Sequence, residues 1–193
     1  MPKSSHRETL LAAGLHVVFE QGYCGASVRD IVQAAGVPQG SFTNHFPSKE
    51  AFCLEVLERY FTLMRENIDK TLRNDSTAPL KRLRAWVDLQ IRFLEQAEMR
   101  NGCLIGNYSV EASDHSEAIR RRLVEIIAEI QESVVYCLKA AVTAGELSSA
   151  TDCDELAHFL YASLQGAILE SKVERSSAPL KRFKKVVFST LLR

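Results

Sequence analysis

The segment Ser27–Lys49, SVRDIVQAAGVPQGSFTNHFPSK, constrains the fold more than any other part of the chain. Ser27 suits the N-cap of a helix, because its hydroxyl can accept a hydrogen bond from an N–H of the first turn. Gly36 suits the end of that helix, since glycine adopts the left-handed conformation at low cost. Pro38 suits the first turn of a second helix, where its missing N–H has no consequence. The segment therefore predicts two short helices joined by a tight turn.

The second helix of this pair, predicted over residues 38–44, carries short and neutral polar side chains. Side chains of this kind hydrogen-bond to base edges and to phosphates. Two helices in this order form a helix-turn-helix, whose second helix enters the major groove of DNA. The candidate contact residues are Ser27, Arg29, Gln39, Ser41, Thr43, Asn44 and His45. Two of them have a structural alternative: Ser27 as a cap only, and His45 as a brace for the turn.

The same segment resembles the DNA-binding motif of the TetR family of bacterial repressors. The matching residues are Asp30, Ile31, Ala35, Gly36, Val37, Gly40, Phe42, His45, Phe46, Ser48, Lys49 and Glu50. Lys49 matches the phosphate-binding lysine of the family and is therefore a further candidate contact. Ser27, Pro38 and Thr43 depart from the family pattern. Thr43 replaces a tyrosine, and the change removes an aromatic contact to a phosphate or a thymine.

The resemblance implies an all-α protein of about nine helices. It implies a helix-turn-helix DNA-binding head at residues 1–47 and a helical body for ligand sensing and dimerisation at residues 48–193. Apolar residues recur at helical spacing through the whole chain, and no strand-like alternation occurs. Outside the motif, helices are predicted over residues 5–21, 48–72, 79–96, 104–112, 152–172 and 179–192. The longest predicted helix begins within residues 113–116 and ends at Gly145.

Charge and composition narrow the function classes. The formal net charge of the 193 residues is zero, and the first fifty contain equal numbers of basic and acidic side chains. This balance argues against a purely electrostatic DNA binder, but a helix-turn-helix needs only a few positioned contacts. The hydrophobic content of 46% is enough for a substantial core.

Compartment and cofactors follow from the cysteines and the apolar runs. Five widely spaced cysteines favour a reducing cytosol over a disulfide framework, so we expect a cytoplasmic protein. The longest mostly apolar run, residues 157–169, is too short to span a bilayer, and the N-terminus lacks the pattern of a signal peptide. No Cys or His pair has the spacing of metal ligands, so we expect neither a metal nor another cofactor.

The resemblance also implies a homodimer on a palindromic double-stranded operator, in which the last two long helices pair with their copies. One stretch supports this, because it carries apolar and small residues over more than one helical face. These residues are Phe159, Leu160, Ala162, Ser163, Gly166, Ala167 and Ile168. The alternative is an ordinary core helix within one chain. In the dimeric interpretation, a signal in the body moves the long helix 48–72 and changes the spacing of the two recognition helices.

The signal is the least constrained part of the interpretation. Cys103 lies in the first turn of a predicted helix, where the backbone dipole favours a thiolate, and Arg100 adds positive charge nearby. The segment around Cys103 resembles an electrophile-sensing subgroup of the TetR family. The resemblance makes Cys103 a candidate sensor and Lys172 a candidate partner for its thiolate. The alternative is that Cys103 is a buried apolar residue.

Two other modes remain open. A repressor could bind a small inducer reversibly, and plausible lining residues between the helices are Trp86, Phe93, Tyr108, Tyr161 and Gln165. An enzyme with Cys103 as nucleophile would need His115 or His158 as its base. The chain lacks a strand–turn–helix elbow, a glycine-rich phosphate loop and paired catalytic carboxylates, so we expect a regulator that is not an enzyme.

Overall fold

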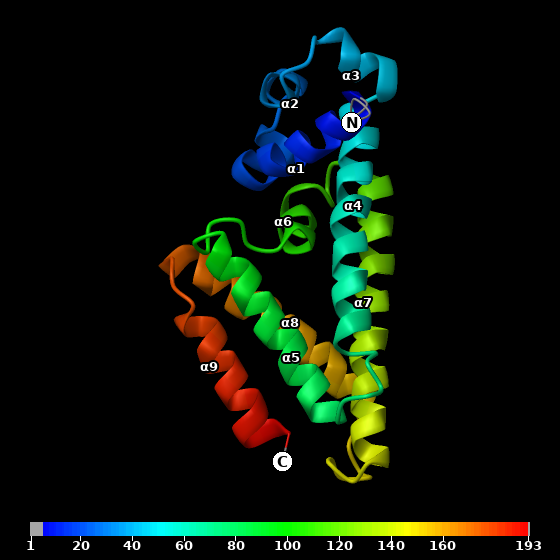
Figure 1. The fold of residues 1–193 in the computed structure, drawn as a ribbon, viewed down its shortest axis with the longest axis vertical. Coiled ribbons are helices and arrows are strands. Elements are labelled where there is room, and N and C mark those ends of the chain that lie inside the picture. Colours follow the sequence, from blue (N-terminus) through cyan, green and yellow to red (C-terminus); the bar gives the residue numbers. More distant parts are fainter. Residues whose placement is uncertain (1–5, 193) are drawn as a thin grey trace. The chain divides into compact units, whose positions relative to one another are not determined.

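The computed structural model describes residues 6–192, and within this range it contains helices and no strands (Figure 1). The helices are α1 His6–Gly25, α2 Val28–Ala35, α3 Gly40–His45, α4 Lys49–Lys70, α5 Pro79–Gln96, α6 Leu104–Glu111, α7 Glu117–Thr143, α8 Cys153–Glu174 and α9 Ala178–Val186. A π-helical segment, Val187–Leu191, follows α9. The predicted all-α class and the count of about nine helices are confirmed for the described residues.

The chain forms two compact units that do not follow a single cut in the sequence. The first consists of the described chain up to Thr62 together with Leu104–Val124, and the second of Leu63–Cys103 together with the chain from Glu125 onward. Helices α4 and α7 each contribute to both units. The expected boundary between residues 47 and 48 stays a prediction about the division of function.

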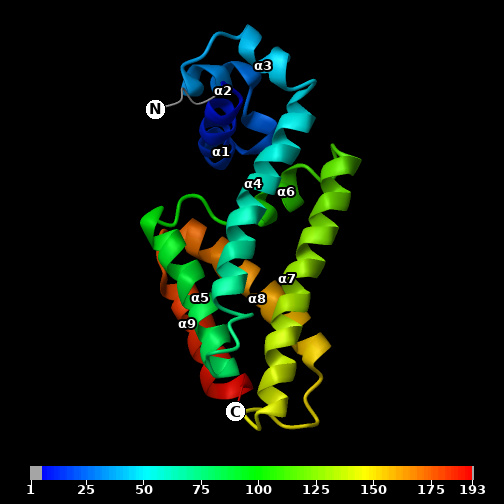
Figure 2. The same ribbon diagram turned by 45° about the vertical axis from the view of Figure 1, so that its right-hand side comes forward.

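The first unit is organised around an aromatic cluster. The rings of Phe42, Phe46 and Phe52 lie 4.8–5.4 Å apart, and all three side chains are buried. They come from α3, the turn after it and the start of α4, so they hold the helix-turn-helix against α4. Helix α1 packs on α2, α3 and α6 (Figure 2). The Phe46 and Phe52 rings meet edge to face, a geometry that adds to the free energy gained by burial.

Helix α2 begins and ends as its sequence predicts. Ser27 Oγ accepts a hydrogen bond from the Asp30 N–H at 3.1 Å, and the Asp30 carboxylate accepts one from the Ser27 N–H at 3.0 Å. This reciprocal pair is a capping box. Gly36 ends the helix in the left-handed conformation, with φ of 63°. Helix α3 begins at Gly40, two residues later than predicted, although the Ser41 N–H already bonds the Pro38 carbonyl.

A glycine interrupts α1 near its C-terminal end. Gly22 has φ of 75° and ψ of 177°, which breaks the helix at the residue where the sequence predicts its end. A side chain there would also overlap the Glu111 carboxylate of α6. That carboxylate accepts a hydrogen bond from the Cys24 N–H at 3.4 Å. The positive φ is therefore what requires glycine at this position, and an added side chain would also displace the Glu111 carboxylate.

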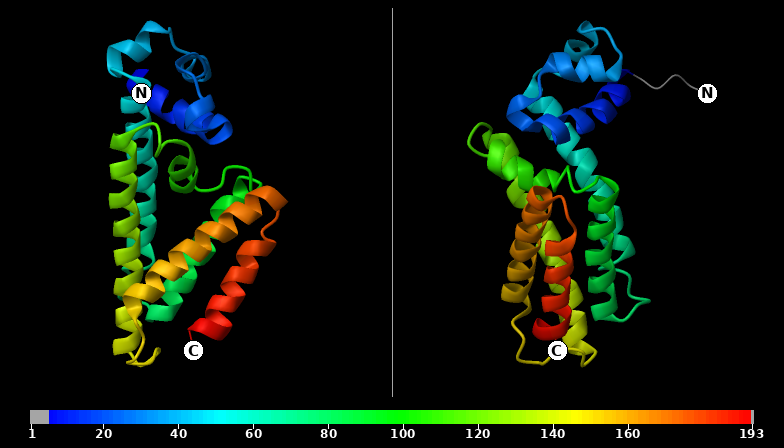
Figure 3. Two further views of the ribbon diagram at one scale, coloured as in Figure 1. Left: turned by 180° about the vertical axis from the view of Figure 1, so that it is seen from behind. Right: turned by 90° about the vertical axis from the view of Figure 1, so that its left-hand side faces the viewer.

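The second unit packs α5, α8 and α9 with the C-terminal parts of α4 and α7. Helix α8 lies beside α9, and α9 lies beside α5 (Figure 3). Helix α5 has proline in its first turn, and the Asp152 carboxylate caps α8. The buried side chains of α5 include Leu83, Trp86 and Val87.

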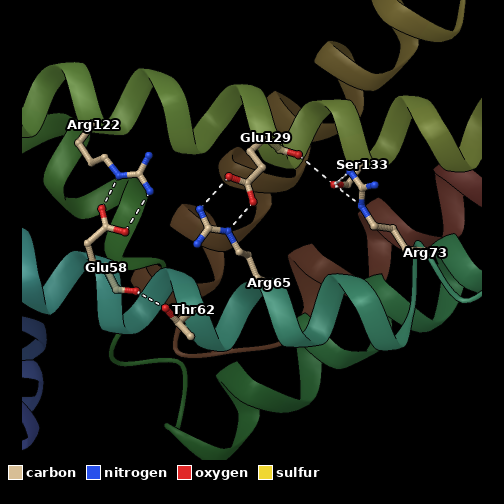
Figure 4. Close-up of polar contacts among 7 residues, drawn as sticks. All are labelled: Glu58, Thr62, Arg65, Arg73, Arg122, Glu129 and Ser133. Carbon is tan, nitrogen blue, oxygen red and sulfur yellow. Dashed lines mark hydrogen bonds and ion pairs between the residues drawn. The ribbon is translucent and has the colours of Figure 1, made fainter.

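Polar pairs connect α4 and α7 inside each unit (Figure 4). In the first unit, the Arg122 guanidinium makes a two-point contact with the Glu58 carboxylate. In the second, Arg65 makes the same kind of contact with Glu129, at 2.5 and 2.9 Å. Two-point arginine–carboxylate pairs fix geometry as well as charge, so they set the register of the two helices.

No helix between residues 6 and 192 is both long and apolar enough to cross a membrane.

Candidate functional site: nucleic-acid interface and buried thiol

The predicted DNA-contacting residues lie mostly on the surface of the first unit. Six of them are exposed and one is half-buried. The exposed residues are Ser27, Arg29, Gln39, Thr43, Asn44 and His45, and the half-buried one is Lys49. No carboxylate occurs within α3, so nothing in that helix repels a phosphate.

Ser41 is the exception to this exposure. Its side chain is only 8% exposed, and its hydroxyl lies 3.2 Å from Nδ1 of His6 in α1. Its hydroxyl therefore braces α3 against α1, and it faces inward instead of toward a partner. His6 and Ser41 are 35 positions apart in the chain, so local sequence patterns do not reveal this contact.

Several surface candidates also have a role inside the unit. The Ser27 hydroxyl caps α2, and the Thr43 hydroxyl donates a hydrogen bond to the Gly40 carbonyl at 3.2 Å. The Lys49 ammonium donates to the Cys24 carbonyl at 3.3 Å and lies 5.1 Å from the centre of the Tyr23 ring. Lys49 thus joins the start of α4 to the end of α1. The charge of Lys49 remains partly exposed.

Gly40, the first residue of α3, has free space where a side chain would be. A methyl group placed on Gly40 would meet no atom within 4 Å, and its φ is not positive. The fold of the chain therefore does not require glycine here. An absent side chain at the start of a recognition helix lets a partner's backbone approach closely.

A second cluster surrounds Cys103 in the second unit. Cys103 directly precedes α6, and so lies just before the first turn in which the sequence places it; it is only 7% exposed. Nε2 of Gln165, on α8, lies 3.6 Å from the Cys103 sulfur. Tyr161, one turn earlier on α8, is buried beside the same thiol. Burial is the main cause that raises the pKa of the Tyr161 hydroxyl, and the electrostatic effect of Cys103 raises it further. The Gln165 amide opposes this shift. The structure thus brings together Cys103, Tyr161 and Gln165 of the predicted sensor residues.

The two predicted cationic partners of the thiolate are Arg100 and Lys172. Arg100 is exposed and pairs with Glu98 at 3.4 Å. Lys172 is half-buried and lies seven residues beyond Gln165 on α8, which is about 10 Å along the helix axis. A role for Lys172 at the thiol stays a prediction.

The proposed pocket residues divide between the units. Tyr108 belongs to the first unit, where its ring packs edge-on against Tyr23 at 5.8 Å, and burial raises the pKa of its hydroxyl. Trp86 belongs to the second unit and is buried with its indole N–H unpartnered. Phe93 is 43% exposed.

The segment before Cys103 has an unusual backbone that the sequence did not reveal. Glu98 and Met99 both have positive φ, of 50° and 57°, and Gly102 has φ of 67°. Residues other than glycine rarely adopt a positive φ, because their Cβ atom then crowds the carbonyl oxygen. Strained backbone of this kind is concentrated at functional sites.

Other cysteines have structural roles. Cys53 and Cys137 are fully buried. Burial raises the pKa of both thiols, that of Cys137 to about 11. A raised pKa makes a thiol less reactive at neutral pH. Among residues 6–192, no group of three or more His, Cys, Asp or Glu side chains has the geometry of a metal site.

Helix α8 exposes large apolar side chains to solvent. Phe159 is 54% exposed, Leu169 is 64% exposed and Val173 is 77% exposed. A groove of about 310 Å³ between α8 and α9 includes Phe159, Ser163, Gly166 and Ala167 in its lining. Leu160 and Ile168, by contrast, are buried within the chain.

Comparisons with known proteins agree with this arrangement. Residues 10–56 match the model of the TetR family of bacterial regulatory proteins. Residues 79–187 match a tetracyclin repressor-like C-terminal domain. The chain is 41% identical over 192 residues to the HTH-type transcriptional repressor DhaR of Mycobacterium sp. (strain GP1), and the match covers 100% of this chain and 95% of DhaR.

Two further proteins are similar. The HTH-type transcriptional repressor NemR of Escherichia coli K12 is 31% identical over 91% of this chain and 88% of NemR. The crystal structure of reduced E. coli NemR has a TM-score of 0.87 at 28% identity, with 95% of each chain covered. A regulatory protein TetR from Rhodobacter sphaeroides has a TM-score of 0.90 at 33% identity, covering 95% of this chain and 97% of that one. The chain belongs to the TetR family, and it is a DNA-binding transcriptional regulator and not an enzyme.

Proposed function

We propose that the chain is a repressor that binds a palindromic operator through Arg29, Gln39, Thr43, Asn44 and His45. The observation that carries this proposal is the exposed, carboxylate-free surface of α3, which begins at an unobstructed glycine. Side chains early in the recognition helix reach base edges, which assigns Gln39 to base reading. Ser27 and Lys49 are the phosphate contacts in this proposal, and each has a structural contact as well.

The repressor acts as a homodimer in this proposal. Helix α8 exposes large apolar side chains, and a groove lies beside α9. Exposed apolar surface of this kind favours burial by a second copy of the chain. A two-fold dimer presents two recognition helices about 34–36 Å apart, or a multiple of that distance, which a palindrome matches. The DNA contacts then depend on the register of both copies.

Cys103 is the sensor in this proposal. Its sulfur lies beside an amide donor, and a strained segment precedes it. Addition of an electrophile enlarges a side chain that is nearly buried, and α6 begins at the next residue. The related NemR structure is described as a reduced form, which agrees with a thiol that changes state.

A reversible inducer is the second candidate signal. Trp86 Nε1 and Ser171 Oγ are buried in the second unit without hydrogen-bond partners. Buried polar groups of this kind are costly unless they are paired, so they favour a polar ligand between the helices.

The test is a titration of the purified protein onto the DNA upstream of its own gene, with and without N-ethylmaleimide. We expect specific binding that N-ethylmaleimide abolishes in the wild type and leaves intact in Cys103→Ser. Specific binding that N-ethylmaleimide does not change would assign the signal to a reversible ligand. Equal affinity for operator and random DNA would contradict the repressor itself.

A further inference from the structure

The Gln165 amide lies between two buried side chains of the second unit. Its nitrogen is 3.6 Å from the Cys103 sulfur, and the same side chain influences the pKa of Tyr161, one turn earlier on α8. An amide nitrogen carries two N–H donors. One of these donors makes the contact with the Cys103 sulfur.

This contact matters more for the thiolate than for the thiol. A neutral thiol is a weak acceptor, whereas a hydrogen bond to a charged sulfur is charge-assisted and about twice as strong. Cys103 is nearly buried, so few water molecules can solvate a charged sulfur there, and a hydrogen-bond donor of the protein can take their place.

The charged groups of the neighbouring segments are directed elsewhere. Arg100 pairs with Glu98, and Arg175 donates to the Met99 carbonyl at 3.3 Å. Lys172 lies about two turns beyond Gln165 on α8. Tyr161 is the ionisable group on α8 beside the sulfur, and burial keeps it neutral. The donor that the geometry places at the Cys103 sulfur is thus a neutral amide.

We propose that Gln165 is a positioning residue for Cys103, which orients the sulfur and stabilises the thiolate that reacts with electrophiles. This inference rests on the proposed sensor function of Cys103. It assigns to α8 a control over the rate at which the thiol reacts.

The reaction with N-ethylmaleimide is balanced as a conjugate addition. The thiol proton leaves to solvent, and the sulfur electron pair forms a C–S bond to an alkene carbon of the maleimide. The alkene π pair then accepts a proton from water. No oxidant or reductant takes part, and the amide of Gln165 is unchanged at the end.

The experiment measures the alkylation rate of Cys103 in the full-length protein by intact and peptide mass spectrometry. Gln165→Met keeps the length of the side chain and removes the donor, and Gln165→Glu keeps the shape and replaces the donor by an acceptor. Gln96→Met, at the exposed end of α5, is the matched control. Circular dichroism and thermal unfolding establish that each variant is folded, and either Gln165 variant alone is sufficient for the test.

At pH 7 we expect Gln165→Met to react about three- to tenfold more slowly than the wild type. This is the loss of a hydrogen bond to a charged group, partly offset because a more basic thiolate is the better nucleophile. Gln165→Glu should be slower still, and Gln96→Met should match the wild type. The rate-against-pH curve of Gln165→Met should also move to higher pH.

An unchanged or faster rate in folded Gln165→Met would overturn the inference while leaving the sensor in place. A slower variant in a protein whose DNA binding ignores N-ethylmaleimide would support the inference and overturn the sensor. A wild-type Cys103 that stays unmodified while Cys24 reacts would overturn both.

Discussion

The Arg175 guanidinium donates a hydrogen bond to the Met99 carbonyl at 3.3 Å, and both residues have positive φ. Arg175 is the C-cap of α8, and Met99 lies in the strained segment that leads to Cys103. Two residues in a costly backbone conformation are thus linked to each other, and the side chain of one stabilises the backbone of the other. This link holds the segment that carries the thiol against the end of α8.

Replacement of Arg175 separates the hydrogen bond from the strain. Arg175→Ala loses the bond and keeps the strain, whereas Arg175→Gly loses the bond and relieves the strain. We expect Arg175→Gly to be more stable than Arg175→Ala by about 1 kcal/mol in the free energy of unfolding from urea titration. Equal stabilities would show that the positive φ of Arg175 costs nothing.

Gly22→Ala should destabilise the protein by about 1–3 kcal/mol, because it combines a positive φ with overlap of the Glu111 carboxylate. Gly25→Ala is the matched control, since its added methyl group would have no neighbour closer than 3.6 Å. Thermal unfolding of both variants measures the difference. A Gly22→Ala protein as stable as Gly25→Ala would contradict the close approach.

Gln39→Ala should weaken operator binding by about 1–3 kcal/mol, the cost of one lost base contact, and leave binding to random DNA nearly unchanged. Gln21→Ala, in the exposed part of α1, is the control. Fluorescence anisotropy with both DNA duplexes separates the two effects. A loss of the same size on random DNA would remove Gln39 from base reading.

Lys49→Ala should weaken binding to all DNA sequences alike. It should also make the slope of log affinity against log salt concentration less steep, by the contribution of about one phosphate contact. It should also lower stability, because the ammonium bonds the Cys24 carbonyl. Lys70→Ala, at the exposed end of α4, should change neither property. An unaltered salt dependence would leave Lys49 with its structural role alone.

Ser27→Ala should destabilise α2 by about 0.5–2 kcal/mol at pH 7, as the loss of an N-cap does. The hydrogen bonds from the Ser27 side chain and backbone lower the pKa of Asp30 below its ordinary value of 3.8. A lowered pKa stabilises the fold at pH values above 3.8, and this contribution is lost as the pH falls below it. The gap between wild type and variant in urea titrations should therefore narrow toward pH 3. A constant gap would separate the cap from the carboxylate.

Local structure could be predicted from the sequence because its signals lie within a few residues of each other. The cap of α2 depends on Ser27 and Asp30, three residues apart, and the start of α5 depends on Pro79. The predicted bounds of α5 match the structure at both ends. Most of the predicted DNA-contacting side chains are exposed for the same reason, since helical spacing determines which face they occupy.

The contacts that complete the candidate sites join residues far apart in the chain. Gln165 and Cys103 are 62 residues apart, and His6 and Ser41 are 35 apart. Spacing along one helix says nothing about such pairs, so Ser41 was expected at the surface and Gln165 only as a general lining residue. The positive φ of Glu98 and Met99 is likewise a product of packing, because neither residue type favours it.

The first compact unit takes Leu104–Val124 from the middle of the chain, including the Glu111 carboxylate that Gly22 accommodates. A chimera that joins the first 62 residues to the body of another repressor would therefore keep a foreign α6 against α1. Exchanging residues 104–124 together with the N-terminal segment would transplant the unit intact. Such a hybrid should keep the promoter choice of this protein, and still respond to a signal in the body, only when both segments of the first unit are exchanged at once.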